Sequence, residues 1–286
     1  MLELFINPKR AERQPWQMFF IGLFYASLSI VLAYIMFGSD PVLSKGMGLL
    51  IVIFCVIFTM PFIYYTIKLE ERKNIEYDEQ IKLLKEHWNA IKVFLWLFLG
   101  FVVAFSFWHM VLPHGQNILN FQIQTYCSIN QHSNYENCLK QYGLLETSGI
   151  TGKVTSKERF LSIFVNNIKV MMLTLFLSLI FGAGAIFILA WNASVIAAAI
   201  GIFTKFQVAS IPIGLGRYMI HGIPEIAAYF VAALAGGILS LAVIRKDLNK
   251  DRFWNILQDS FNLLIIAIII IFVSGIIEVF ITPKLF

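Results

Sequence analysis

The sequence predicts an all-α integral membrane protein with about seven transmembrane segments. Hydrophobic residues make up 58% of the 286 residues and charged residues only 14%, whereas about 25% of the residues in a soluble domain are charged. The apolar residues form runs of about twenty along the whole chain, the length that a helix needs to cross the ~30 Å hydrocarbon core of a bilayer. No block of basic residues is interleaved with aromatic ones, so we expect the lipid bilayer, and no nucleic acid, as a partner.

The N-terminal part, residues 1–70, is predicted to form a hairpin of two spans. The first span covers residues 18–37 and ends at a turn-forming segment of Gly, Ser, Asp and Pro. The second covers residues 47–67, with Pro61 near its end. The basic N-terminus is not followed by a short apolar core with a small-residue cleavage site, so we expect the first span to be retained and not removed as a signal peptide.

Residues 71–90 are predicted to form a cytoplasmic amphipathic helix. The stretch is dense in charges of both signs, but Ile81, Leu84 and Trp88 recur at intervals of three or four residues and so share one face of a helix. A helix of this kind lies in the membrane interface. We expect it to lead directly into the third span.

The remainder, residues 91–286, is predicted to be a membrane domain with an extracytoplasmic loop at 113–160. Its spans are expected at 91–112, 166–190, 193–206, 223–244 and 261–281. Residues 193–206 are too few for a full crossing by a typical helix, and the segment 207–220 is rich in glycine and proline. We therefore expect one short or re-entrant element there, shielded from lipid by protein or by a water-filled cavity.

The distribution of basic residues predicts the orientation of the chain. With the N-terminus in the cytoplasm, more than half of the 22 lysines and arginines lie in cytoplasmic segments close to span ends, as the positive-inside rule expects. Seven spans then place the C-terminus outside the cytoplasm of a multi-pass protein of the cell membrane. The same topology places Cys127 and Cys138 outside, where a disulfide between them can form.

Two stripes of small residues are predicted to be helix-packing surfaces. Their members recur every four residues and so share one face of a helix. Small side chains let a neighbouring backbone come close, which drives helix association in lipid. The stripes can serve contacts within the chain or in a homo-oligomer. They consist of Ala193, Ala197 and Gly201 and of Ala228, Ala232, Gly236 and Ser240.

Polar and ionisable residues are expected to meet on the extracytoplasmic side of the bundle. His221 and Glu225 are four residues apart, on one face of a helix that we expect to have Pro224 in its first turn. An ionisable group at membrane depth is costly, so it has a partner or a function. The residues predicted to form this cluster are Asn166, Asn167, Lys169, Arg217, His221, Glu225 and Glu278.

Three roles fit this polar cluster. It can be a clamp that holds helices in register, or a binding or permeation site for a polar ligand, an ion or a lipid headgroup. Catalysis or metal binding has the least support, because the chain lacks two histidines flanking a glutamate, and one histidine with one glutamate are too few ligands for zinc. We therefore expect no catalytic residue, no metal and no cofactor.

A series of motifs between about residues 90 and 281 suggests a family. The pair Asn166-Asn167 precedes a span with Gly182 and Gly184, and segment 221–228 reads His-Gly-Ile-Pro-Glu-Ile-Ala-Ala. With these motifs the chain resembles the stage II sporulation protein M family of prokaryotic membrane proteins. It departs from the family at Asn192-Ala193, where the family has Asn-Gly, and the first two spans look like an N-terminal addition.

The resemblance implies a non-enzymatic membrane scaffold that organises other membrane or envelope proteins. The family takes its name from a scaffold that recruits peptidoglycan-remodelling enzymes during engulfment in spore-forming bacteria. The residues themselves allow an alternative, a transporter-like or lipid-handling component with a polar ligand site at the outer leaflet. A cavity reaching deep into the membrane beside Glu225 would favour this alternative, whereas a dry, packed cluster would favour the scaffold.

Overall fold

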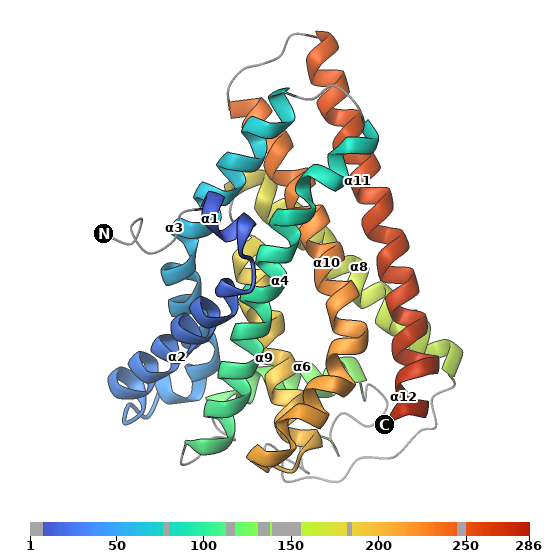
Figure 1. Cartoon of the computed structure of the whole chain (residues 1–286). Coiled ribbons are helices and arrows are strands. Elements are labelled where there is room, and N and C mark those ends of the chain that lie inside the picture. The colour runs from blue at the N-terminus through green and yellow to red at the C-terminus, as the bar shows by residue number, and fades with distance from the viewer. Residues whose placement is uncertain are drawn as a thin grey trace.

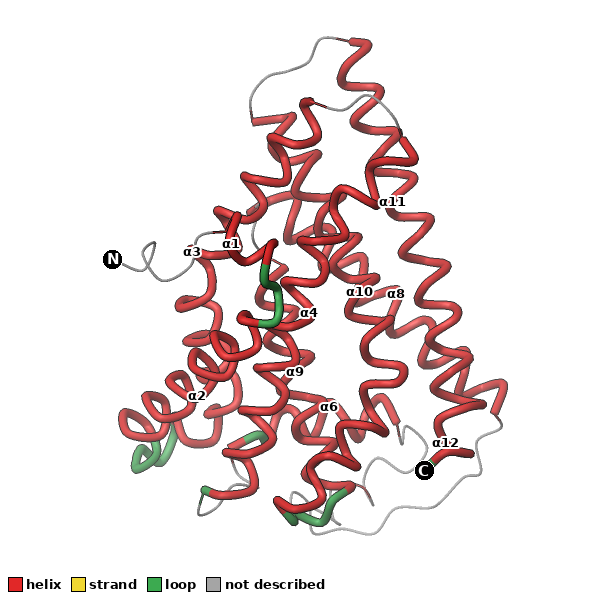
Figure 2. Tube along the Cα trace, viewed as in Figure 1, coloured by secondary structure: helices red, strands yellow, loops and turns green. Residues whose placement is uncertain are grey.

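The computed structural model describes residues 8–76, 80–112, 118–130, 138, 156–181, 185–244 and 250–286, and none of these residues forms a strand. Within this described part, seven helices are long and apolar enough to cross a membrane, which confirms the predicted fold class (Figures 1 and 2). The main helices are α1 (Pro8–Arg13), α2 (Gln17–Phe37), α3 (Met47–Glu76), α4 (Gln80–Val111), α6 (Asn120–Asn130), α8 (Ser156–Phe181), α9 (Ala185–Phe203), α10 (Ile211–Ile244), α11 (Lys250–Ile276) and α12 (Thr282–Leu285).

The helices pack around α4, α9 and α10, which have the most buried spans. Helix α2 packs along α4, α4 packs against α9, and α10 packs against both α8 and α11. Figure 1 shows α2 and α3 on one flank of this centre and α8 and α11 on the other. Large aromatic side chains fill the core where α4 passes through it, among them the fully buried Phe98, Phe101 and Phe105. The structure contains no membrane, so the cytoplasmic position of the N-terminus stays a prediction.

Glycines set the closest helix crossings. A Cβ atom on Gly236 of α10 would lie 2.5 Å from the carbonyl oxygen of Leu175 on α8. The other members of the α10 stripe, Ala228, Ala232 and Ser240, are buried as well. A second crossing was not predicted: Gly22 of α2 and Gly100 of α4 each lie against the other helix so closely that a Cβ atom would overlap its backbone.

The stripe on α9 faces α4. Ala193 and Ala197 are fully buried, and a Cβ atom on Gly201 would lie 2.8 Å from the ring of His109. Both predicted stripes thus lie at contacts within the chain. Small residues at these points allow the close approach that stabilises helix pairs in lipid.

The predicted boundary between the fourth and fifth spans is wrong. The turn expected at 191–194 lies inside α9, and the chain instead passes from α8 to α9 between Phe181 and Ala185. The physical reason is that Asn192 donates a hydrogen bond to the carbonyl of Ile188, at 2.7 Å, so its polar side chain is satisfied within the helix. The fifth span is therefore 185–203, long enough to cross, and not the short segment 193–206.

The prediction of a broken element at 207–220 is also corrected. A short 3₁₀ turn at Val208–Ser210 leads into α10, which continues for 34 residues with Pro224 inside it and not at its start. Pro212 occupies the first turn of α10, where its missing N–H group costs nothing. Proline inside a membrane helix is tolerated where a side chain satisfies a nearby carbonyl, and Ser274 donates a hydrogen bond of 2.7 Å to the carbonyl of His221.

The predicted amphipathic helix at 71–90 is divided between two long helices. Helix α3 continues to Glu76 and α4 begins at Gln80, with residues 77–79 outside the described part of the chain. No glycine or proline follows Pro61 in α3 that would end the helix at residue 70. The charged segment therefore extends the second and third spans, and its position at the membrane interface stays a prediction.

The predicted loop 113–160 contains α6, which packs under α9. Gln122 of α6 is fully buried and donates hydrogen bonds to the carbonyl of Gly48, at 3.0 Å, and to the hydroxyl of Ser194, at 3.1 Å. Cys127 of α6 forms a disulfide with Cys138, with the two Cα atoms 5.7 Å apart, which is the predicted pairing. Cys55 is a free, buried cysteine in α3.

Candidate functional site

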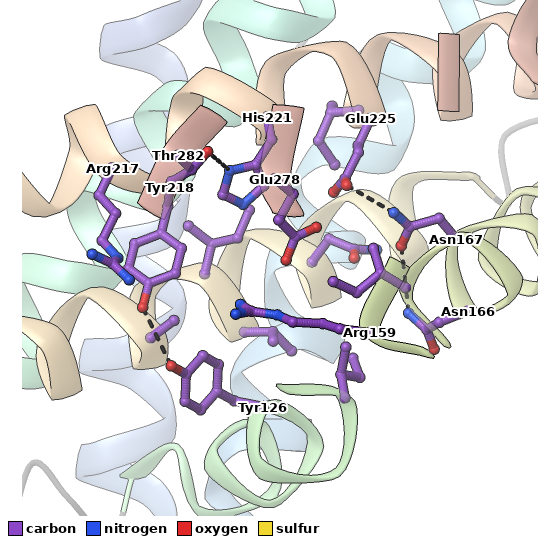
Figure 3. A pocket seen from close by; sticks show the side chains of 18 of the residues that line it. Tyr126, Arg159, Asn166, Asn167, Arg217, Tyr218, His221, Glu225, Glu278 and Thr282 are labelled. Atoms are coloured by element: carbon purple, nitrogen blue, oxygen red, sulfur yellow. Dashed lines mark hydrogen bonds between the residues drawn. The ribbon is translucent and has the colours of Figure 1, made fainter. Parts of the chain in front are cut away.

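A partly enclosed cavity of about 120 Å³ lies where α6, α8, α9, α10 and the C-terminal end of the chain converge. Its polar lining (Figure 3) carries charges of both signs. Each water molecule needs about 10–15 Å³ of such space, so the cavity holds several waters or a small polar group. The polar residues that line it are Tyr126, Arg159, Asn166, Asn167, Asn192, Arg217, Tyr218, His221, Glu225, Glu278 and Thr282.

One side of the cavity is acidic. The side-chain amide of Asn167, which is only 6% exposed, donates a hydrogen bond of 2.7 Å to Oε1 of Glu225. The hydroxyl of Ser274 lies 3.3 Å from the same oxygen, but its single proton has the shorter contact, to the His221 carbonyl. Glu278 lies close enough to Glu225 for the two carboxyl groups to interact. The neutral side chains of Asn167 on α8 and Ser274 on α11 thus both approach Glu225 on α10.

The opposite side is lined by arginine and tyrosine. The hydroxyls of Tyr126 on α6 and Tyr218 on α10 are 3.4 Å apart. The guanidinium of Arg217 lies over the ring of Phe203, 4.6 Å from its centre, a contact that holds a cation in place. Arg159, at the start of α8, extends across the cavity toward Tyr126 and Tyr218 (Figure 3). Within the part of the chain that the structure describes, neither arginine forms an ion pair with a carboxylate.

His221 lies between the acidic and the basic side. Its Nδ1 atom is 3.3 Å from the hydroxyl of Thr282, and its ring contacts that of Tyr218, with 6.2 Å between the ring centres. Thr282 follows a π-helical turn, Ile277–Ile281, that also carries Glu278. Such turns are frequent at functional sites because the extra residue changes the direction of the side chains. Here the turn brings Glu278 and Thr282 to the same cavity.

The cavity-lining residues follow a simple pattern on their helices. Side chains four residues apart lie on one face of a helix, and the cavity receives one such series from each of three helices. The three series are Arg159, Ile163 and Asn167 on α8, Arg217, His221 and Glu225 on α10, and Glu278 and Thr282 at the end of the chain. The helices thus present a polar face to one another at this end of the bundle.

The structure brings six of the seven predicted cluster residues to the cavity, and Lys169 is the exception. Lys169 follows Asn167 by two residues, which rotates its side chain by about 200° around the helix axis. It is exposed on the opposite face of α8. The direct contact that Glu225 makes within the predicted cluster is the hydrogen bond from Asn167.

Several cavity residues were not predicted. Thr282 could have been found from its spacing of four residues to Glu278 in an otherwise apolar span, and so could Ser274, which contacts Glu225 without lining the cavity. Arg159 could have been found from its spacing to Asn167. No local signal marks Tyr126, Tyr218 or Asn192, because their place depends on how α6, α9 and α10 pack. Among the described residues, no group of three or more His, Cys, Asp or Glu side chains could hold a metal ion.

Comparison with known proteins gives the family of the chain. The sequence pattern of the family described as "Stage II sporulation protein M" matches residues 51–283, which include every residue of the cavity. A protein of Methanocaldococcus jannaschii, described only as uncharacterised, is 34% identical over 131 residues, which cover 44% of this chain and 72% of that protein. No solved structure matches the chain. The chain is a multi-pass membrane protein that belongs to the stage II sporulation protein M family.

Proposed function

We propose that the chain is a non-enzymatic membrane component, transporter-like or lipid-handling, that binds a polar ligand in this cavity. The observation that carries the proposal is the cavity itself, with charges of both signs around open space beside Glu225. Ionisable groups within membrane spans are costly and mark substrate or ion pathways in many membrane proteins.

The geometry fits a binding site better than a structural clamp. In a clamp, opposite charges would pair directly and leave no space between them. Here the carboxyl groups of Glu225 and Glu278 and the guanidinium groups of Arg159 and Arg217 surround the same cavity without an ion pair among them. Charged groups that form no ion pair within the protein are stabilised by water or by a ligand.

The cavity also has depth along α10. Arg217 and Glu225 are eight residues apart, so their backbones are separated by ~12 Å along the helix axis. Arg217 is nearer the start of α10, and Glu225 lies ~21 Å from that start. A ligand that enters at the start of α10 would meet the basic side first and the acidic side last.

The scaffold role that the family resemblance implies stays a prediction, and so do a homo-oligomer and contacts with other envelope proteins. Scaffolding requires no open polar space in the bundle. The proposal of a ligand site therefore depends on whether water reaches the cavity, which can be measured directly.

Cysteine accessibility tests the proposal. Ile196 lines the cavity, whereas Ala193 lies on the same helix, is fully buried and does not line it. In intact cells, a charged, membrane-impermeant methanethiosulfonate should modify an Ile196→Cys variant and leave an Ala193→Cys variant unmodified. The native cysteines give little background, because Cys55 is buried and the other two form the disulfide.

The side from which the reagent acts also reports the orientation. Modification of the Ile196→Cys variant in intact cells places the cavity outside the cytoplasm, and modification only in inverted vesicles places it inside. If neither preparation shows faster modification of Ile196→Cys than of Ala193→Cys, the cavity is closed to water and the proposed function is wrong.

A further inference from the structure

We infer that the ligand of this cavity is a compact zwitterion with an ammonium group at one end and a phosphate or carboxylate group at the other. The inference rests on the proposed function and names the chemistry of its ligand. The same chemistry occurs in free molecules and in the headgroups of zwitterionic lipids.

Among the described residues, no cation forms an ion pair with the carboxyl groups on the acidic side, although Arg159 is near enough to Glu278 to attract it. Glu225 and Glu278 approach each other closely enough to interact, and Asn167 and Ser274 offer Glu225 neutral hydrogen-bond donors. A buried carboxylate is stabilised most by a charged donor. An ammonium group has three donors and can reach both carboxyl groups at once.

On the basic side, no carboxylate of the described chain forms an ion pair with Arg159 or Arg217. The guanidinium of Arg217 is held against Phe203, and Arg159 reaches into the cavity without forming an ion pair within the described chain. A guanidinium binds phosphate or carboxylate through two parallel hydrogen bonds. The hydroxyls of Tyr126 and Tyr218 lie on the same side and can donate further hydrogen bonds to an anion.

The cavity is small, and part of its lining is apolar. Ile163, Ile196 and Ile226 line the cavity together with the charged groups, so the ligand is expected to have a short hydrocarbon link between its charges. A volume of about 120 Å³ is close to the ~150 Å³ that holds a benzene-sized molecule. The site therefore admits a headgroup-sized ligand and excludes a peptide or an oligosaccharide.

A ligand with a single charge would fit this cavity less well. A simple anion that bound between the arginines would still face the two glutamates, and a simple cation beside the glutamates would still face the two arginines. Like charges placed next to each other lower affinity and so give specificity. A zwitterion satisfies both sides at once.

Binding of phosphoethanolamine, a soluble probe with both charges, tests the inference. Thermal unfolding of the full chain in detergent is followed at constant ionic strength with phosphoethanolamine, inorganic phosphate or ethanolamine, because a ligand that binds the folded state raises the melting temperature. We expect phosphoethanolamine to bind about tenfold or more tightly than either single-charge probe.

Three variants identify the groups that recognise each end. Glu278→Gln and Arg159→Gln should each weaken phosphoethanolamine binding by about tenfold or more, and Arg159→Gln should also remove any effect of phosphate. Lys169→Gln, which removes an exposed charge on the far face of α8, is the matched control and should bind as the parent does.

Native mass spectrometry of protein from vesicles of mixed phosphatidylethanolamine and phosphatidylglycerol distinguishes the two sources of the ligand. Retention of phosphatidylethanolamine by the parent chain and its loss in Arg159→Gln would identify a lipid headgroup. Binding of soluble phosphoethanolamine without retained lipid would identify a free zwitterion. Either result supports the inference.

The inference and the proposed function can fail separately. If phosphate or ethanolamine alone binds as tightly as phosphoethanolamine, the ligand is not a zwitterion, although the cavity remains a binding site. The same holds if Ile196→Cys is reactive but neither phosphoethanolamine nor phosphatidylethanolamine binds. If Ile196→Cys is unreactive, both are wrong.

Discussion

Replacement of Asn167 by alanine removes the amide that joins α8 to the carboxyl group of Glu225 on α10. The hydrogen bond is 2.7 Å long, and the hydroxyl of Ser274, 3.3 Å from the same oxygen, has its proton in a shorter contact with the carbonyl of His221. Asn167→Ala therefore leaves a partly buried carboxyl group with little support, next to the carboxyl group of Glu278.

The expected cost follows from the charge of the acceptor. A hydrogen bond to a charged group contributes about 1.5–3 kcal/mol, whereas one between neutral groups contributes about 0.5–1.5 kcal/mol. Glu225→Gln keeps an acceptor for Asn167 and adds amide protons that can face Glu278, so we expect this variant to fold at least as stably as the parent. In the Glu225→Gln background, Asn167→Ala should cost only the smaller, neutral amount.

A double-mutant cycle in detergent measures this difference. The free energy of unfolding of the parent, the two single variants and the double variant gives the coupling between Asn167 and Glu225, expected at about 1 kcal/mol or more. An Asn167→Ala variant as stable as the parent would refute the role given to this hydrogen bond, and zero coupling would show that its acceptor is uncharged. A Glu225→Gln variant that unfolds as easily as one with a disrupted helix crossing would refute the ligand site and favour a clamp.

Three further predictions concern packing, the disulfide and an exposed turn. Gly236→Leu should prevent the close crossing with Leu175 on α8 and lower the melting temperature far more than Gly236→Ala, and equal melting temperatures would exclude that contact. Thiol labelling of unreduced, denatured protein should modify one cysteine only, and reduction of the disulfide between Cys127 and Cys138 should destabilise the chain by ~3 kcal/mol in the chain-entropy model. Asp40 accepts hydrogen bonds from two backbone N–H groups of the following turn, which lower its pKa from the usual 3.8. Its stabilising effect should be present at neutral pH and lost as the pH falls through this lowered pKa, and the thermal stability of Asp40→Asn compared with the parent should show no difference at the most acidic pH.

The pattern of the sequence determined those features of the protein that depend on local chemistry. Seven apolar runs determined seven spans, because backbone groups in lipid must be satisfied within each helix and this requires runs of a fixed length. Helical periodicity also determined that Ala228 and Gly236 share a packing face and that His221 and Glu225 share a polar one. Spacing along one helix was enough for each of these features.

Tertiary structure decided which of these faces meet. Composition does not tell whether Arg159 or Lys169 points into the bundle, because both lie on α8. The packing of α8 against α10, closest at Gly236, decides which face of α8 is turned toward the cavity. The turn at 191–194 was predicted from a polar residue, Asn192, whose side chain is satisfied inside α9. The cavity itself arises because five separate segments converge at the same place, and that convergence depends on contacts between residues far apart in the chain.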